Sequence, residues 1–170
     1  MNTPSHHRLG VYAGSFDPPT NGHLWMIEEG SRLFDKLIVA VGVNPQKKPT
    51  FPLSERLEFL KAIVKGFDNI ETAAYENEFL ANYARRVGAT HILRGIRGAK
   101  DFEYEHTFRH INGDMNGDVT TVFLTPPRNL EEISSSTVLA LIGPHGWREV
   151  VSKMVPAPVA QALEEKFKHL

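Results

Sequence analysis

Residues 37–43, Leu37-Ile38-Val39-Ala40-Val41-Gly42-Val43, decide the fold because none of their side chains is polar. The run is far shorter than the about 20 apolar residues that a membrane-spanning helix needs. Its composition is typical of a β-strand. A strand that is apolar on both faces has to be covered on both, as in a parallel sheet flanked by helices. The stretch therefore predicts a strand inside an α/β fold.

Strand-like runs and helix-like windows alternate on both sides of this stretch. Further strands are predicted at Leu9–Ala13, Asn69–Ala74, His91–Arg94 and Val119–Leu124. Apolar residues recur at helical spacing within Leu24–Phe34, Leu53–Val64 and Phe79–Val87, and in a stripe of Phe102, Phe108, Ile111 and Met115. This order predicts an α/β, Rossmann-like doubly wound sheet of about five parallel strands, with helices on both faces. A helical C-terminal tail follows Pro144, with Val159–Phe167 as its clearest helix.

The length and charge of the chain suit one compact domain. Its 170 residues predict a core over about residues 9–142 and a helical C-terminal segment over about 145–170. A net charge of −1 argues against a broad basic face for nucleic acid, and the absence of cysteine excludes disulfides and Cys-bound metals. Met1–Arg8 is polar and lacks the apolar core of a signal peptide. We therefore expect a cytoplasmic protein whose partners are neither membranes nor nucleic acids.

The first predicted strand runs into a turn rich in glycine and proline, Gly14-Ser15-Phe16-Asp17-Pro18-Pro19-Thr20-Asn21-Gly22-His23. This turn places the Ser15 hydroxyl at a strand end and His23 at or near the start of a helix. Phosphate is the natural ligand of a helix N-terminus, and an imidazole there can donate a hydrogen bond to it. The plain alternative is that His23 only caps the helix. Neither the P-loop pattern nor the dinucleotide fingerprint is present.

Three later strand ends also carry cations or hydroxyl groups. A stiff loop after the second strand holds Lys47 and Lys48, and the fourth strand ends in Arg94-Gly95-Ile96-Arg97, followed by Asp101 as a predicted N-cap. After the fifth strand, Ser134-Ser135-Ser136-Thr137 offers more hydroxyl groups than one helix cap requires. Each feature has a structural alternative. The lysines can be solvated, the arginines can pair with Glu103 and Glu105, and the serines can be a simple cap.

These loops all leave the same edge of a parallel sheet, where ligands of doubly wound folds bind. Together they predict one polyphosphate site. His106 and His110 have a spacing compatible with a metal, but no glutamate follows His106 as the zinc-protease pattern requires. A serine nucleophile is not expected, because the chain has no Gly-x-Ser-x-Gly elbow. We therefore expect no protein-bound metal and no covalent intermediate.

The same residues resemble the bacterial phosphopantetheine adenylyltransferases, in the nucleotidyltransferase superfamily that carries a Thr-x-Gly-His motif. The resemblance runs from about Val11 to about Thr137, and its most specific part is Arg-Gly-x-Arg followed by Asp-Phe-Glu-Tyr-Glu. The matching segments are Gly14–Pro18, Thr20–His23, Lys47–Pro49, Arg94–Arg97, Asp101–Glu105 and Ile133–Ser136.

The resemblance implies a reaction of coenzyme A biosynthesis, in which ATP and 4′-phosphopantetheine give dephospho-coenzyme A and pyrophosphate. It also implies Mg²⁺ carried with the nucleotide phosphates, coenzyme A as a further ligand, and a homo-oligomer that is usually a hexamer. The implied catalytic residues are His23, Lys47 and Arg94, with His23 stabilising charge on the α-phosphate. The implied nucleotide-binding residues are Ser15, Phe16, His23, Gly95, Ile96, Arg97, Glu105, Leu130, Glu131, Glu132, Ile133, Ser134, Ser135 and Ser136. The acceptor would contact Ser15, Lys47, Leu80, Arg94, Phe108 and Asn112.

Elementary chemistry agrees with this set of side chains. The attacking group would already be a phosphate oxyanion, so no general base is required. The protein has to position two anions and stabilise the charge that develops between them. Cations, hydroxyl groups and helix starts suit that task, and Mg²⁺ typically binds through substrate phosphates and water.

Departures from the family pattern leave two alternatives open. Leu130-Glu131-Glu132 stands where an aromatic-Ser-aromatic pattern is common, Glu76–Phe79 is bulkier and more acidic than usual, and Arg109 and Gly113 differ around Asn112. A related transferase that uses CTP or another phosphorylated acceptor is the first alternative. A non-catalytic nucleotide-binding module is the second alternative. It is disfavoured because the chain retains the imidazole of His23 and the three cations Lys47, Arg94 and Arg97.

Overall fold

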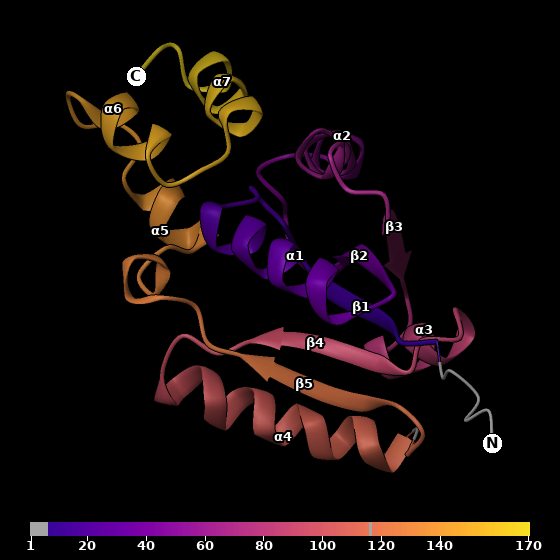
Figure 1. Cartoon of the computed structure of the whole chain (residues 1–170). Helices are drawn as coiled ribbons and strands as arrows, with labels where there is room; N and C mark the ends of the chain where they lie inside the picture. The colour runs from indigo at the N-terminus through magenta and orange to yellow at the C-terminus, as the bar shows by residue number, and fades with distance from the viewer. Residues whose placement is uncertain (1–6, 116) are drawn as a thin grey trace.

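The computed structural model describes residues 7–115 and 117–170, so most of the polar stretch Met1–Arg8 lies outside the described residues. A five-stranded parallel sheet in the order β3-β2-β1-β4-β5 forms its centre (Figure 1). The strands are β1 (Leu9–Gly14), β2 (Lys36–Val43), β3 (Ile70–Glu76), β4 (His91–Gly95) and β5 (Thr120–Leu124). The five predicted strands and the parallel, doubly wound arrangement are confirmed.

The helices follow the predicted alternation. They are α1 (Asn21–Leu33), α2 (Leu53–Val64), α3 (Leu80–Arg86), α4 (Ala99–Met115), α5 (Ser135–Ala140), α6 (Trp147–Ser152) and α7 (Ala157–Lys166), with a short 3₁₀ turn η1 (Arg128–Leu130). The predicted cap of α4 is wrong, because α4 begins at Ala99 and Asp101 lies within its first turn. Within residues 7–115 and 117–170, none of the helices combines the length and the apolar composition that a membrane span requires.

The two faces of the sheet are covered by different helices. Met26 and Ile27 of α1 and Leu60 and Val64 of α2 pack on one face, with Leu37, Val39 and Val41 of β2. Tyr83 and Ala84 of α3 pack on the other face against Ile38 and Ala40, and Phe102 of α4 lies against Phe123 of β5. The β2 side chains are therefore buried on both sides, as their apolar sequence requires.

The strand order creates a switch point between β1 and β4. The chain moves outward from β1 to β3 and then returns past β1 to form β4 and β5. Right-handed crossovers put helices on one face for outward steps and on the other for return steps. The loops after β1 and β4 therefore diverge, and the gap between them opens at the carboxyl edge of the sheet.

Helices α6 and α7 pack against α2 and the segment before it rather than against the sheet. Trp147, Val151 and Val159 share an apolar cluster with Phe51 and Phe59, which belong to the segment before α2 and to α2 itself. The N-terminus of α1 is tied to the same region, because the Asn21 backbone N–H donates to the Met154 carbonyl at 2.9 Å. Figure 1 shows α5 next to the start of α1 and α6 and α7 beyond it.

The apolar stripe predicted for α4 is not buried within this chain. Phe102 is 48% exposed, Phe108 40%, and Ile111 and Met115 39% each, whereas Glu105 is the buried residue of the helix. The helical spacing is correct, but apart from the contact of Phe102 with Phe123 the face it marks stays largely exposed. The periodicity of the sequence predicts which residues of a helix share one face. What covers that face depends on the tertiary structure.

Close packing of α1 on the sheet depends on Gly30. A Cβ atom at this position would come within 2.9 Å of methyl groups of both Leu37 and Leu93. We expect Gly30→Val to lower the free energy of unfolding by about 2 kcal/mol through overpacking, as measured by urea denaturation. Gly66→Ala is the matched control, since a Cβ there meets no atom within 4 Å. Equal stability of Gly30→Val and the wild type would contradict this account of the packing.

Candidate active site

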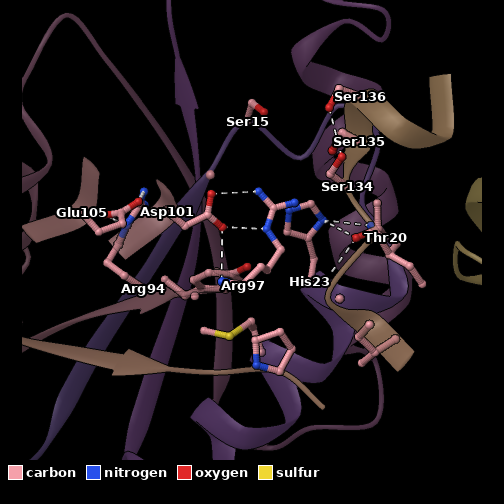
Figure 2. A pocket seen from close by; sticks show the side chains of 18 of the residues that line it. Ser15, Thr20, His23, Arg94, Arg97, Asp101, Glu105, Ser134, Ser135 and Ser136 are labelled. Atoms are coloured by element: carbon pink, nitrogen blue, oxygen red, sulfur yellow. Dashed lines mark hydrogen bonds and ion pairs between the residues drawn. The ribbon is translucent and has the colours of Figure 1, made fainter. Parts of the chain in front are cut away.

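A cavity of about 460 Å³ lies at the switch point, beyond the carboxyl ends of β1 and β4. Its walls come from four parts of the chain. These are the end of β1 with the loop to α1, the start of α1, the segment from β4 into α4, and the segment from β5 into α5. Figure 2 shows their polar side chains around one space.

Eleven of the predicted site residues line this cavity together. They are Ser15, His23, Arg94, Gly95, Arg97, Glu105, Leu130, Ile133, Ser134, Ser135 and Ser136. Residues more than a hundred positions apart in the sequence thus open onto one space, as expected from the order of the loops. The two carboxylates of the segment that departs from the family pattern, Glu131 and Glu132, are exposed and are not part of the lining.

Other predicted residues lie outside this lining. Phe16 and Ile96 are buried behind it, and Lys47 lies in the exposed segment between β2 and α2, so only three of the four strand-end loops line the cavity. Leu80 begins α3, while Phe108 and Asn112 lie further along α4.

The neutral tautomer of His23 follows from its contacts at the start of α1. The Thr20 backbone N–H donates to Nδ1 of His23 at 2.9 Å, and the Thr20 hydroxyl accepts from the His23 backbone N–H at 3.4 Å. Because Nδ1 accepts a hydrogen bond from the backbone, the ring proton is on Nε2. Helix capping and a role toward a ligand are therefore compatible: one ring nitrogen caps, and the other carries the free donor.

The surroundings keep the His23 imidazole uncharged near neutral pH. Burial, and to a lesser extent the positive charge of Arg97, lowers the pKa of His23 from 6.5 to about 4. The ring also packs edge-on against Phe16, with centroids 5.0 Å apart. His23 thus offers a fixed, neutral N–H donor rather than a cation.

Arg94 is held rigidly from two sides. Its Nε donates to Glu105 at 2.7 Å, its Nη2 forms a second contact with the same carboxylate, and its Nη1 donates to the Ala13 carbonyl at 2.9 Å. Burial alone would lower the pKa of Arg94, but the hydrogen bond and charge of Glu105 outweigh it and raise that pKa. The guanidinium therefore stays charged and keeps a fixed orientation.

Arg97 pairs with Asp101 instead of with the glutamates named in the structural alternative. Its Nε lies 2.9 Å from Asp101 Oδ2, and its positive charge contributes to the lowered pKa of His23. Arg97 lies just before α4, and its backbone N–H also donates to Asp101 Oδ2 at 3.3 Å, so Asp101 holds both the backbone and the side chain of Arg97. One half of that alternative is correct, since Arg94 does pair with Glu105.

The serine run combines a cap with additional hydroxyl groups. Ser134 caps α5, with its hydroxyl accepting from the Thr137 backbone N–H at 3.1 Å. Ser135 donates to the Pro18 carbonyl at 2.8 Å and so joins this segment to the loop after β1. Ser136 is exposed and lies 3.0 Å from the Ser134 hydroxyl. The run therefore connects two walls of the cavity as well as lining it.

Sequence reasoning missed several lining residues, including Tyr12, Thr20, Met26, Asp101 and Tyr104. Thr20 was visible as part of a motif, but its backbone contact with His23 depends on the turn geometry. Tyr12 lies inside a strand whose pattern reads as plain core, and burial raises the pKa of its hydroxyl. No signal in the sequence distinguishes it from its apolar neighbours.

Comparison with known proteins agrees with this fold and cavity. A family model described as cytidylyltransferase-like matches residues 11–140, which defines the class of protein. A Plasmodium falciparum nicotinic acid mononucleotide adenylyltransferase complexed with APC has the same fold, with a TM-score of 0.67 at 15% identity over 96% of each chain.

Closer relatives identify the family within this class. A phosphopantetheine adenylyltransferase from Chromobacterium violaceum is 56% identical over 152 residues, covering 89% of this chain and 93% of that protein. One from Neisseria meningitidis serogroup C is 50% identical over 168 residues, covering 99% and 97%. The chain belongs to the phosphopantetheine adenylyltransferase family.

The depressed pKa of His23 predicts how stability depends on pH. Between pH 6.5 and about 4 the unfolded chain binds a proton at this residue and the folded chain does not, so acid favours unfolding in that window. We expect the free energy of unfolding of the wild type to fall relative to His23→Gln as the pH drops through it. Urea titrations from pH 7 to 4 measure the difference, and His91, whose pKa is also lowered, is present in both proteins and cancels. A constant difference across the window would contradict the assignment.

Proposed function

We propose that this chain transfers the adenylyl group of ATP to 4′-phosphopantetheine, giving dephospho-coenzyme A and pyrophosphate. The observation that carries this proposal is the single cavity that brings the neutral His23 donor together with the guanidinium groups of Arg94 and Arg97. The relatives named above are phosphopantetheine adenylyltransferases, and this chain matches them over nearly their whole length. We also propose that the protein acts in the cytoplasm.

The reaction needs positioning more than proton transfer. A phosphate oxygen of the acceptor forms a bond to the α-phosphorus of ATP, and the bond from that phosphorus to the bridging oxygen of the β-phosphate breaks. Pyrophosphate leaves with the electron pair of that bond. Negative charge builds up on the α-phosphate oxygens, so fixed donors stabilise the transition state without a general base.

Each cavity residue has a role that its contacts suit. His23 donates its Nε2–H to an α-phosphate oxygen, because Nδ1 is already occupied by Thr20. Arg94 binds the acceptor phosphate through the N–H groups that its contacts with Glu105 and Ala13 leave free. Gly95, Arg97, Glu105, Leu130 and the segment from Ile133 to Ser136 surround the nucleotide, with Ser15 between the two ligands.

In our proposal the pantetheine chain of the acceptor extends from its phosphate away from this cavity. Leu80 and the α4 residues Phe108 and Asn112 are half-buried or exposed, and α3 and α4 pack against each other. They supply apolar and amide contacts suited to a pantetheine chain. Lys47 would reach the acceptor phosphate from the exposed segment after β2, which leaves it free of the rigid contacts that hold Arg94.

Mg²⁺ is proposed to enter with the nucleotide. Within residues 7–115 and 117–170, no group of three or more His, Asp or Glu side chains could hold a metal ion. The ring centroids of His106 and His110 lie 4.5 Å apart, but the two rings have no third donor beside them. This donor set suits an ion held by phosphates and water, whose charge would neutralise the pyrophosphate leaving group.

The test of the function is a pyrophosphate-release assay with purified protein. We expect turnover with ATP and 4′-phosphopantetheine, and at least a hundredfold lower kcat/KM with CTP or with pantothenate phosphate as acceptor. Higher turnover with CTP would favour the related transferase named in the sequence analysis. Binding of ATP without release of pyrophosphate, whatever the acceptor, would favour a non-catalytic module.

His23→Asn separates binding from catalysis in the same assay. The contact of Nε2–H with the α-phosphate strengthens as charge develops, so we expect kcat to fall about 10²–10³-fold and the Kd for ATP to change less than about threefold. Calorimetry measures the Kd. His145→Asn is the control, because His145 is exposed and outside the cavity lining. Equal losses in kcat and ATP affinity would contradict the role of His23.

We also propose that the chain forms a homo-oligomer, a hexamer by resemblance to the family. The support is the C-terminal part of the stripe on α4, where two large apolar residues, Ile111 and Met115, are each 39% exposed. A second copy of the chain would cover this surface, and large exposed apolar patches commonly mark interfaces.

A charge placed in this stripe tests the assembly. We expect the wild type to have a mass several times 19.1 kDa in light scattering, and Ile111→Glu with Met115→Glu to shift it to a smaller species. Lys100→Glu, on the exposed start of the same helix, is the control for charge. A monomeric wild type would overturn the proposal.

A further inference from the structure

We propose that Arg56, a residue of α2 outside the cavity, is a positioning residue that holds the loop after β1 in its ligand-binding conformation and supplies an unpaired positive charge behind it. The inference rests on the proposed function, since it assigns this charge to the recognition of a polyphosphate. It concerns a side chain that does not line the cavity.

Arg56 reaches the loop from inside the protein. It is 5% exposed, and its Nη1 donates to the Ser15 carbonyl oxygen at 2.8 Å across 41 positions of sequence. Ser15 lines the cavity through the other side of the same turn. The guanidinium thus fixes the backbone of a loop whose outer surface faces the ligand.

The charge of Arg56 is incompletely matched by its protein surroundings. Its buried Nε atom has no hydrogen-bond partner, and no carboxylate pairs with it in the described part of the chain. The two arginines of the cavity differ in this respect, because Arg94 pairs with Glu105 and Arg97 with Asp101. A buried cation without a counter-charge is costly, and an anionic ligand beyond the loop would offset that cost.

A second contact also joins the loop after β1 to the region of α2, and here a side chain of the loop binds backbone groups near α2. The Asp17 carboxylate accepts from the backbone N–H groups of Thr50 at 2.7 Å and Phe51 at 2.8 Å, just before α2. With the Arg56 contact on one side and the Asp17 contact on the other, the loop after β1 is fixed to the start of α2 at both ends of Ser15–Asp17.

The fixed loop reaches the reacting groups through Phe16. Phe16 has a φ of +47°, a left-handed conformation that non-glycine residues seldom adopt. Its fully buried ring packs against Tyr12 and His23. Because Arg56 holds the carbonyl group directly before this residue, its loss would release Phe16 and loosen the packing that orients the His23 ring.

Three substitutions of Arg56 separate charge, donor and bulk. Arg56→Lys keeps the charge, Arg56→Gln keeps a donor without charge, and Arg56→Met keeps only the apolar stem. Lys61→Met on the same helix is the matched control, since it removes one positive charge from an exposed side chain that pairs with Glu58. Calorimetry with ATP and with inorganic tripolyphosphate gives the Kd, thermal unfolding gives Tm, and the pyrophosphate assay gives kcat and KM.

We expect Arg56→Gln to weaken binding of both probes at least tenfold and to lower kcat as well, while Arg56→Lys stays within about threefold of the wild-type Kd. Lys61→Met should match the wild type. Arg56→Met replaces Arg56→Gln in the comparison if the latter does not fold.

Two results would overturn the inference: wild-type affinity for both probes in folded Arg56→Gln, or a lower Tm with unchanged affinity, which marks a merely structural role. If the wild type binds ATP but releases no pyrophosphate with any acceptor, the proposed function fails, and the effect of Arg56→Gln on tripolyphosphate binding still decides the role of Arg56. If the wild type binds neither probe, the inference fails too.

Discussion

The right-handed crossover between parallel strands determines where the helices and the cavity lie in this protein. It forces the chain to place α1 and α2 on one face of the sheet and α3 and α4 on the other, because the path reverses after β3. The reversal separates the loops after β1 and β4, and the cavity occupies the space between them. Without it, the cationic end of β4 would not face the start of α1.

The charges around the cavity are arranged before any ligand binds. Arg94 and Arg97 are each held by a carboxylate, and the contact with Thr20 fixes the neutral His23 in one tautomer. A site organised in this way does not need to reorient its dipoles while charge develops on a phosphate, which is the main source of electrostatic catalysis. These pairs also reduce the net positive charge of the cavity wall. In our proposal Arg56, which has no paired carboxylate among the described residues, adds a positive charge behind the loop that favours a polyphosphate.

The C-terminal helices extend the same organisation outward. Their apolar cluster includes Phe51, whose backbone N–H is held by Asp17, and the carbonyl of Met154 accepts from the first N–H of α1. The loop after β1, the start of α1 and the start of α2 are therefore supported from one side by α6, α7 and the turn between them, none of which contributes a lining residue to the cavity. The long α4 differs, since most of its apolar side chains remain at the surface.

The strands, most of the helix positions and the polar segments at the strand ends can be predicted from the sequence. Apolar runs such as residues 37–43 are long enough to specify buried strands, and glycine, proline and serine mark the turns between elements. The identity of many cavity residues followed as well, because parallel strands deliver their carboxyl ends to one edge. These features are local, so a short stretch of chain carries the information.

The partners of those side chains become visible only in the folded protein. Folding paired Arg97 with Asp101, left Lys47 outside the lining, exposed the stripe on α4 and buried Arg56 against Ser15. Each of these outcomes joins or separates groups whose distance depends on how the helices pack on the sheet. Hydrogen bonds and ion pairs act over a few ångströms, whereas a sequence pattern fixes only which face or loop a residue occupies, so the partner of a charge is settled by folding.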